Sequence, residues 1–123
     1  MNDTEKVLER LSGVVEDKGR LPTISDYETL EKAISRFGKD AQIDMAIEEM
    51  SELAKALLKE RRVSKKHGFT AHPEMIEIAE ENISEEMADV IIMMVQLQMI
   101  YNNNEKVLSF INRKVERLKS RLD

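Results

Sequence analysis

The sequence predicts an all-α fold, and three observations lead to that prediction. Residues that favour helices, such as Leu, Met, Glu, Lys and Ala, dominate the chain, whereas aromatic residues, which favour strands, make up only 4%. Turn formers are equally scarce, with 4 Gly and 2 Pro. Apolar residues recur at three- and four-residue spacing along most of the chain. A chain of 123 residues builds one hydrophobic core, so we expect a single domain over residues 1–123.

Two helices are expected at the start of the chain. Residues 1–22 are assigned to an N-terminal extension helix, because apolar residues keep a helical spacing up to Gly19. A second, short helix should follow with Thr23 or Ser25 as its N-cap and Gly38 as its stop.

Two long helices follow on either side of a connection. The first runs from Asp40 to about Arg62, and its apolar stripe, which we expect to be buried, consists of Ile43, Ala46, Ile47, Met50, Leu53, Ala54, Leu57 and Leu58. Gly68 and Pro73 then interrupt the helical pattern, which predicts an exposed connection. The second long helix is expected from Pro73 to Tyr101.

The last helix is predicted from Glu105 to Leu122, after a turn at residues 102–104 whose asparagines offer a ready N-cap. Three long helices with one or two short ones predict a four-helix-bundle-like fold. The segment from Val90 to Ile100 is apolar nearly all round, and a bundle this small can hardly cover it. We therefore expect a homodimer or homotetramer.

The overall composition excludes several classes of function. The chain has no Cys, so it forms no disulfide and no Cys-based zinc site, as suits a reducing compartment. Its charged N-terminus lacks the apolar core of a secretory signal, and we expect a cytoplasmic protein. The longest apolar run is far shorter than the ~20 residues of a membrane span. A net charge of -5 argues against nucleic acid as a partner.

An acidic pattern occurs twice, as EEMSELA at 48–54 and as EEMADVI at 85–91. The second and fifth residues of each copy share one helix face and stand at the edge of an apolar stripe. A carboxylate that loses water there needs a partner. If the two helices pack antiparallel, four carboxylates converge, and such oxygen ligands favour Mg²⁺ or Mn²⁺ over zinc. The candidate metal ligands are Glu49, Glu52, Glu86 and Asp89.

A purely structural interpretation stays open for these acids. Glu-rich helices are common on solvated surfaces, and Lys55 or Lys59 can pair with Glu52. Iron-binding carboxylate bundles use Glu-x-x-His, and neither His67 nor His72 has that spacing. The metal interpretation is favoured because both copies lie beside apolar positions and neither has a basic i+4 partner on its apolar side.

The chain resembles the MazG-like all-α nucleoside triphosphate pyrophosphohydrolases, relatives of the dimeric dUTPases and of the phosphoribosyl-ATP pyrophosphohydrolases. The segments GKDAQIDMAIEEMSELAKALLK, ENISEEMADVIIMMVQLQMIY and NRKVERLKSRL carry the resemblance, within a MazG-like core at 36–122. It implies a MazG fold and a Mg²⁺-dependent enzyme. Such an enzyme hydrolyses an NTP or dNTP to the monophosphate and pyrophosphate by attack of water at the α-phosphorus.

The resemblance also implies roles for individual residues. The four acids would bind the metal, and Glu49 would polarise the attacking water. The residues that would contact the substrate phosphates are Asn112, Lys114 and Arg117. The interval from Glu52 to Glu86 is longer than in typical members, and its insertion at 61–74 is either a basic lid or a solvated loop, of which we favour the loop.

Two alternatives remain for the function. The first is a phosphoribosyl-ATP pyrophosphohydrolase, which shares the fold and the chemistry. The second is a non-enzymatic helical protein whose Met-rich fourth helix serves oligomerisation or partner binding.

Overall fold

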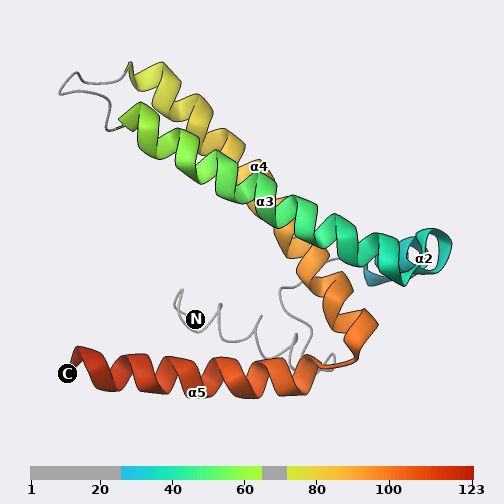
Figure 1. The fold of residues 1–123 in the computed structure, drawn as a ribbon. Helices are drawn as coiled ribbons and strands as arrows, with labels where there is room; N and C mark the ends of the chain where they lie inside the picture. Colours follow the sequence, from blue (N-terminus) through green and yellow to red (C-terminus); the bar gives the residue numbers. More distant parts are fainter. Residues whose placement is uncertain (1–25, 65–71) are drawn as a thin grey trace, which may run out of the picture.

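The computed structural model describes residues 26–64 and 72–123, and all secondary structure in these two ranges is helical (Figure 1). The helices are α2 (Tyr27–Phe37), α3 (Lys39–Ser64), α4 (Pro73–Tyr101) and α5 (Asn104–Leu122). The all-α prediction is therefore confirmed for this part of the chain. The predicted extension helix at 1–22 lies outside the described residues. None of the described helices is long and apolar enough to cross a membrane.

α2 has a well-defined cap at each end. Asp26 is its N-cap: one carboxylate oxygen accepts the Thr29 N–H at 3.0 Å and the other accepts the Thr29 hydroxyl at 2.6 Å. The predicted caps, Thr23 and Ser25, lie outside the described residues, and the prediction is corrected to Asp26, whose two oxygens satisfy two donors at once. These bonds lower the pKa of the Asp26 carboxyl. Gly38 ends the helix as predicted.

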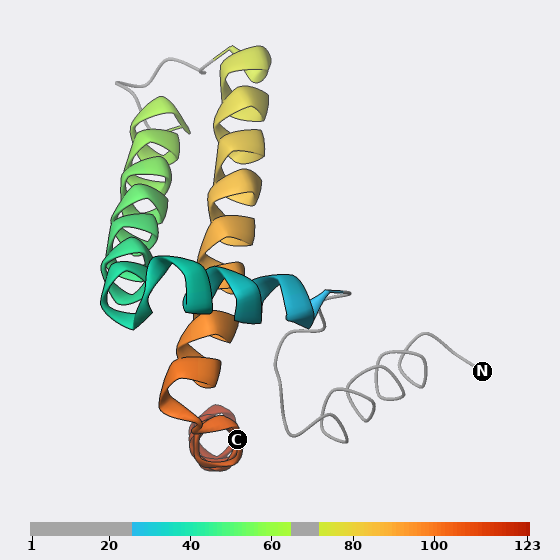
Figure 2. The same ribbon diagram turned by 90° about the vertical axis from the view of Figure 1, so that its right-hand side faces the viewer.

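α3 and α4 form an antiparallel hairpin that makes the largest packing interface of the described chain (Figures 1 and 2). The buried residues along it include Ala46 and Ala56 on α3 and Ala79 on α4. Small side chains at a helix contact let the two axes approach closely. Both helices agree with their predicted bounds to within two residues.

α2 crosses the hairpin where α3 begins and contacts both helices, and α4 continues past it (Figure 2). Much of the core of the described chain lies in the second half of α4, where Met93 and Val95 are buried. Gln96 and Gln98 are buried there as well, and Gln42 of α3 is also buried. Ile91, Ile92 and Met94 of the same segment are 37–41% exposed, so the described chain covers it only in part.

α5 departs from the hairpin and makes no extended packing contact with α2, α3 or α4 among the described residues (Figure 1). These helices therefore do not close into a four-helix bundle. Its N-cap position is taken by Asn103, but the side chain makes no capping hydrogen bond, contrary to the prediction. The preceding residue, Asn102, instead adopts a left-handed conformation that ends α4.

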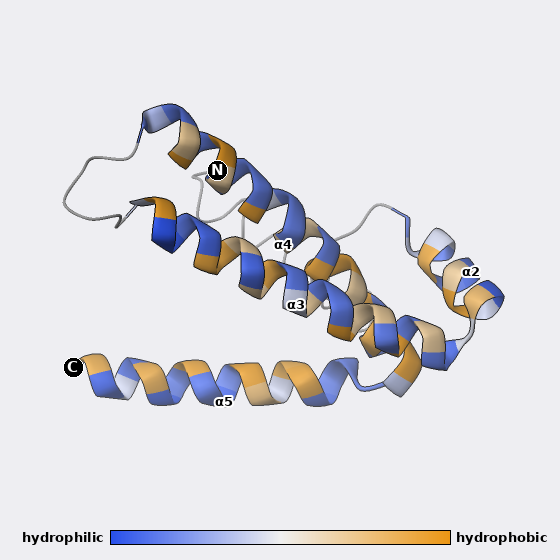
Figure 3. Ribbon diagram, turned by 45° about the horizontal axis from the view of Figure 1, so that its top comes forward, coloured by the Kyte–Doolittle hydropathy of each residue, from blue (hydrophilic) through white to orange (hydrophobic). Residues whose placement is uncertain are grey.

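The apolar stripe predicted to be buried on α3 is largely open, which corrects the sequence analysis. Ala46 is buried, but Ile47, Met50, Leu57 and Leu58 are 41–59% exposed. A single helix, α4, covers only a narrow strip of α3. Successive residues of a helix are rotated by about 100° around its axis. When positions are counted from the buried alanines, the exposed stripe of α3 and a second exposed stripe, on α4, lie on the same side of the hairpin. We call this side the apolar face: Ile47, Met50, Leu57, Met87, Ile91 and Met94 (Figure 3).

Gly38 should be sensitive to any side chain. Its φ of 94° and ψ of 149° lie in a region that only glycine adopts without strain, although an added Cβ would meet nothing within 4 Å. We predict that Gly38→Ala lowers the free energy of unfolding by about 1–3 kcal/mol in urea denaturation. The adjacent helical substitution Lys39→Ala is the control. If Gly38→Ala lowered the free energy of unfolding no more than Lys39→Ala does, the backbone at Gly38 would not be strained by a side chain.

Candidate functional site

The two acidic motifs face each other across the α3–α4 hairpin. One carboxylate oxygen from each of Glu49, Glu86 and Asp89 lies within 4.8 Å of the other two, and all three residues are half-buried. The i, i+3 spacing places Glu86 and Asp89 on one face of α4, and the antiparallel packing brings Glu49 of α3 opposite them. We call this group the acidic triad. The structure thus brings together three of the four predicted metal ligands.

Glu52, the fourth predicted ligand, stands outside the triad. One of its carboxylate oxygens accepts a hydrogen bond from the Lys55 ammonium at 3.2 Å, the pairing that the sequence suggested. Its negative charge is still among the causes that raise the pKa values of Glu49 and Glu86, so it belongs to the same electrostatic environment. A direct metal-binding role for Glu52 stays a prediction.

The triad carries an electrostatic cost in the folded chain. Partial burial is the main cause that raises the pKa of Glu49, followed by repulsion from Asp89 and Glu86. Partial burial likewise raises the pKa of Glu86, with Asp89 as the next cause. Loss of water disfavours the ionised carboxylate, and each neighbouring negative charge adds to that effect. The two helices therefore hold these acids together against mutual repulsion.

One oxygen of Glu86, Oε2, is enclosed and has no hydrogen-bond partner, although the residue as a whole is only half-buried. Within the described residues no Lys or Arg forms an ion pair with a member of the triad. Convergent carboxylate oxygens without a positively charged partner fit a hard divalent cation, because Mg²⁺ and Mn²⁺ take oxygen ligands. The residues that would hold such an ion are Glu49, Glu86 and Asp89.

The predicted substrate-binding residues lie away from the triad in this chain. Asn112, Lys114 and Arg117 are all exposed on α5, which leaves the hairpin (Figure 1). At about 100° per residue, Lys114 and Arg117 share a side of α5 whereas Asn112 points to another. A phosphate-binding role for these residues stays a prediction, and it requires α5 of another chain or a different placement of α5.

The insertion between the motifs is described only in part. Helix α3 continues to Ser64, so Arg61 and Arg62 are helical and exposed. Lys65 and Lys66 lie outside the described residues, as does His67. His72 is exposed at the N-cap of α4, where its side chain makes no capping hydrogen bond. The described ends of this insertion thus contribute no side chain to the triad.

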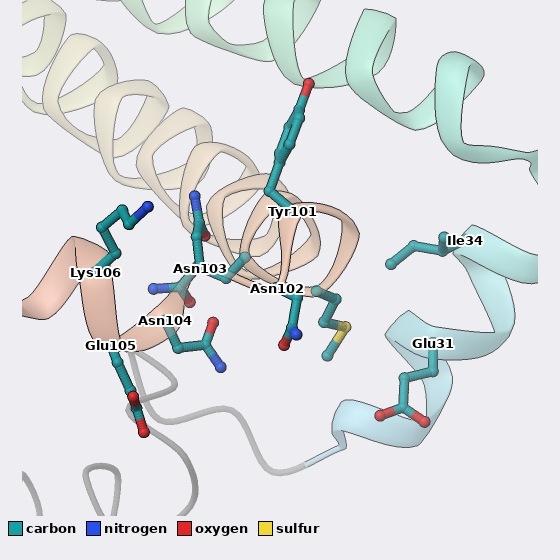
Figure 4. Close-up of a pocket in the computed structure, with 10 residues that line it drawn as sticks. Glu31, Ile34, Tyr101, Asn102, Asn103, Asn104, Glu105 and Lys106 are labelled. Carbon is teal, nitrogen blue, oxygen red and sulfur yellow. The ribbon is translucent and has the colours of Figure 1, made fainter.

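A separate cavity of about 930 Å³ lies where α2, the end of α4 and the start of α5 meet (Figure 4). The amide oxygens of Asn103 and Asn104 are enclosed there and lack a hydrogen-bond partner. The sequence predicted only a turn with an N-cap in this stretch, although its three consecutive asparagines also indicate a polar lining. Glu31 and Glu105 stand on opposite sides of the cavity, so it does not gather carboxylates as the triad does (Figure 4).

Comparison with known proteins identifies no relative: no family model, no curated protein and no solved structure matches the chain. The resemblance to the MazG-like hydrolases therefore depends on the two acidic motifs and the segments around them.

The raised pKa values make a prediction about stability. A carboxyl whose pKa is higher in the folded than in the unfolded chain binds its proton more tightly when folded, so its contribution is greatest below the ordinary value of 4.5 and is lost as the pH rises through the raised value. In the absence of divalent cations, Glu86→Gln should therefore raise the melting temperature at pH 7. It should also flatten the fall in stability between about pH 4.5 and neutrality.

The matched control is Glu81→Gln, which removes the same charge elsewhere on α4 and outside the triad. Melting curves followed by circular dichroism over this pH range provide the measurement. A lower melting temperature for Glu86→Gln than for the control would show that the Glu86 carboxylate is stabilised rather than strained.

Proposed function

We propose that this chain is a Mg²⁺-dependent nucleoside triphosphate pyrophosphohydrolase, which converts an NTP or dNTP to the monophosphate and pyrophosphate. The observation that carries the proposal is the convergence of Glu49, Glu86 and Asp89 between two antiparallel helices. The resemblance of the two acidic motifs to those of the MazG-like hydrolases supplies the class of reaction. Together they support a MazG-like arrangement of the α3–α4 hairpin.

The charge of the substrate explains why an acidic site suits this reaction. A triphosphate carries about four negative charges, so carboxylates alone would repel it. Mg²⁺ bound by the triad would neutralise phosphate charge and stabilise the leaving pyrophosphate. The protein's own contribution is to hold three carboxylates together on two packed helices, so that the site is formed before substrate arrives.

Glu49 is the proposed acceptor of the water proton. A carboxylate within hydrogen-bond reach of the attacking water can act as its general base. In the proposed reaction the oxygen of water forms a bond to the α-phosphorus and its proton passes to Glu49. The bond between the α-phosphorus and the oxygen that bridges to the β-phosphorus breaks, and pyrophosphate leaves with that oxygen.

The apolar face supports the expectation of a homodimer or homotetramer. Its six residues are 37–59% exposed, and a contiguous apolar surface of this kind is typical of an interface. The same face favours the second candidate function, a helical interaction protein without enzymatic activity. The two candidates differ in what they require of the triad, since only the enzyme needs a bound cation.

The enzymatic proposal predicts turnover of a nucleotide panel. With Mg²⁺ and canonical or modified NTPs and dNTPs, together with phosphoribosyl-ATP, we expect equal amounts of monophosphate and pyrophosphate from at least one substrate. Glu49→Gln should lower kcat by about 100-fold or more, because the proton acceptor is lost. Glu60→Gln, about three turns further along the same helix and outside the triad, is the matched control and should keep its activity. No turnover of any substrate would overturn the proposal.

Magnesium binding separates the enzyme from the interaction protein. Isothermal titration with MgCl₂ should give a saturable signal in the unsubstituted chain, and Asp89→Asn should abolish it, because the triad would lose one of its oxygen charges. Glu81→Gln, also on α4 but outside the triad, should bind as before. The interaction-protein hypothesis expects no magnesium signal and no effect of Asp89→Asn.

A further inference from the structure

α5 presents an apolar stripe that nothing in the described chain covers. Ile111, Val115, Leu118 and Leu122 follow the spacing i, i+4, i+7 and i+11, which places them on one helix face, and they are 40–78% exposed (Figure 3). An isolated helix of 19 residues is marginal in water, so most helices of this length depend on packing of their apolar face. α5 therefore needs a partner for this stripe.

The α3–α4 hairpin carries a groove of matching character on the side away from the apolar face. Its volume is about 580 Å³, and it lies between the last turns of α3 and the first turns of α4. Its floor is apolar, and Met75 and Ile78 are 53% and 69% exposed. Glu81 and Glu85 also line it, on the α4 side.

The charges of α5 are complementary to those of the α4 side of the groove, whereas Lys59 lines the α3 side. Between Pro73 and Tyr101, α4 has seven acidic residues and no Lys or Arg. Between Asn104 and Leu122, α5 has six Lys or Arg and two acidic residues. By helical geometry Lys114, Lys119 and Arg121 flank the apolar stripe of α5, where they would meet the acids beside the groove.

The lengths also agree. From Ile111 to Leu122 the stripe rises about 16 Å, and from Met75 to Glu85 the α4 side of the groove rises about 15 Å, at 1.5 Å per residue. A fold-back within one chain does not produce this match. If α5 turned back along its own α4 from Asn102, Val115 would lie beside the middle of α4, about ten residues or roughly 15 Å short of Ile78.

We propose that α5 of one copy docks in the groove between α3 and α4 of a second copy, with its apolar stripe on Met75 and Ile78 and its cations beside Glu81 and Glu85. This surface is distinct from the apolar face. An assembly that uses both the groove and the apolar face would pack helices of other copies on both sides of each hairpin, in agreement with the expected homo-oligomer.

Disulfide trapping tests the proposal, because the chain has no cysteine of its own. The full chain is prepared as Ile78→Cys and as Val115→Cys, with tags of different size, and the two variants are mixed, unfolded, refolded together and oxidised. We expect a mixed disulfide of intermediate size to be the main cross-linked product on a non-reducing gel. Ser109→Cys, on the opposite face of α5, replaces Val115→Cys in the control and should lose most of this product.

Two further readouts make the result decisive. Light scattering at micromolar concentration should show that Leu118→Glu reduces the molar mass while the helical circular dichroism is kept. Ser120→Glu adds the same charge on the polar face and should not reduce the mass. If the sole cross-linked product were the homodisulfide of Val115→Cys, α5 would pair with α5 and the proposal would be overturned. Equal cross-linking in the Ser109→Cys control would also overturn it, and so would a monomer.

Discussion

The close antiparallel contact between α3 and α4 is the constraint on which the rest of the structure depends. Ala46, Ala56 and Ala79 are buried along it, and their small side chains allow the helix axes to approach closely. Because the helices are antiparallel, the two acidic motifs meet near the middle of the hairpin. A larger side chain at any of the three positions would separate the helices and would spread the carboxylates apart.

That contact sets the electrostatic character of the centre of the hairpin. Glu49 and Glu86 are partly buried beside other acids in the hairpin, and their pKa values rise. The enclosed oxygen of Glu86 adds to this electrostatic cost, because a buried hydrogen-bond acceptor without a donor destabilises the folded chain. A bound divalent cation would relieve both the repulsion and the missing partner. The same packing that costs the chain stability thus prepares the proposed magnesium site.

A hairpin of two helices has a second consequence, because it cannot cover its own apolar residues. Each helix buries one narrow strip, and the remaining strips form the apolar face on one side and the groove on the other. α5, with its own exposed stripe, adds to this uncovered surface instead of reducing it. The described part of the chain therefore has more apolar residues than its small core can bury. Association between copies would supply the missing neighbours for all three surfaces.

The sequence by itself determined the helices and the composition of the acidic motifs. Local rules are sufficient for these features: helical spacing defined α3 and α4 to within two residues, and Gly38 ended α2 because a positive φ favours glycine. The i, i+3 spacing likewise placed Glu86 and Asp89 on one face. These features depend on residues a few positions apart, so no knowledge of the tertiary fold was needed.

Only the tertiary structure decided which residues contact each helix face. A helical wheel identifies an apolar stripe but cannot say how much of it a partner helix will cover, and so Ile47 and Leu57 were expected to be buried and are exposed. Nor can it tell that Glu49 and not Glu52 would join the triad, because both acids lie on the same shoulder of α3. The path of α5 depends on Asn102, whose left-handed conformation turns the chain away from the hairpin. Contacts between residues far apart in sequence settled the exposure of the α3 stripe and the membership of the triad, and those contacts depend on packing rather than on local spacing.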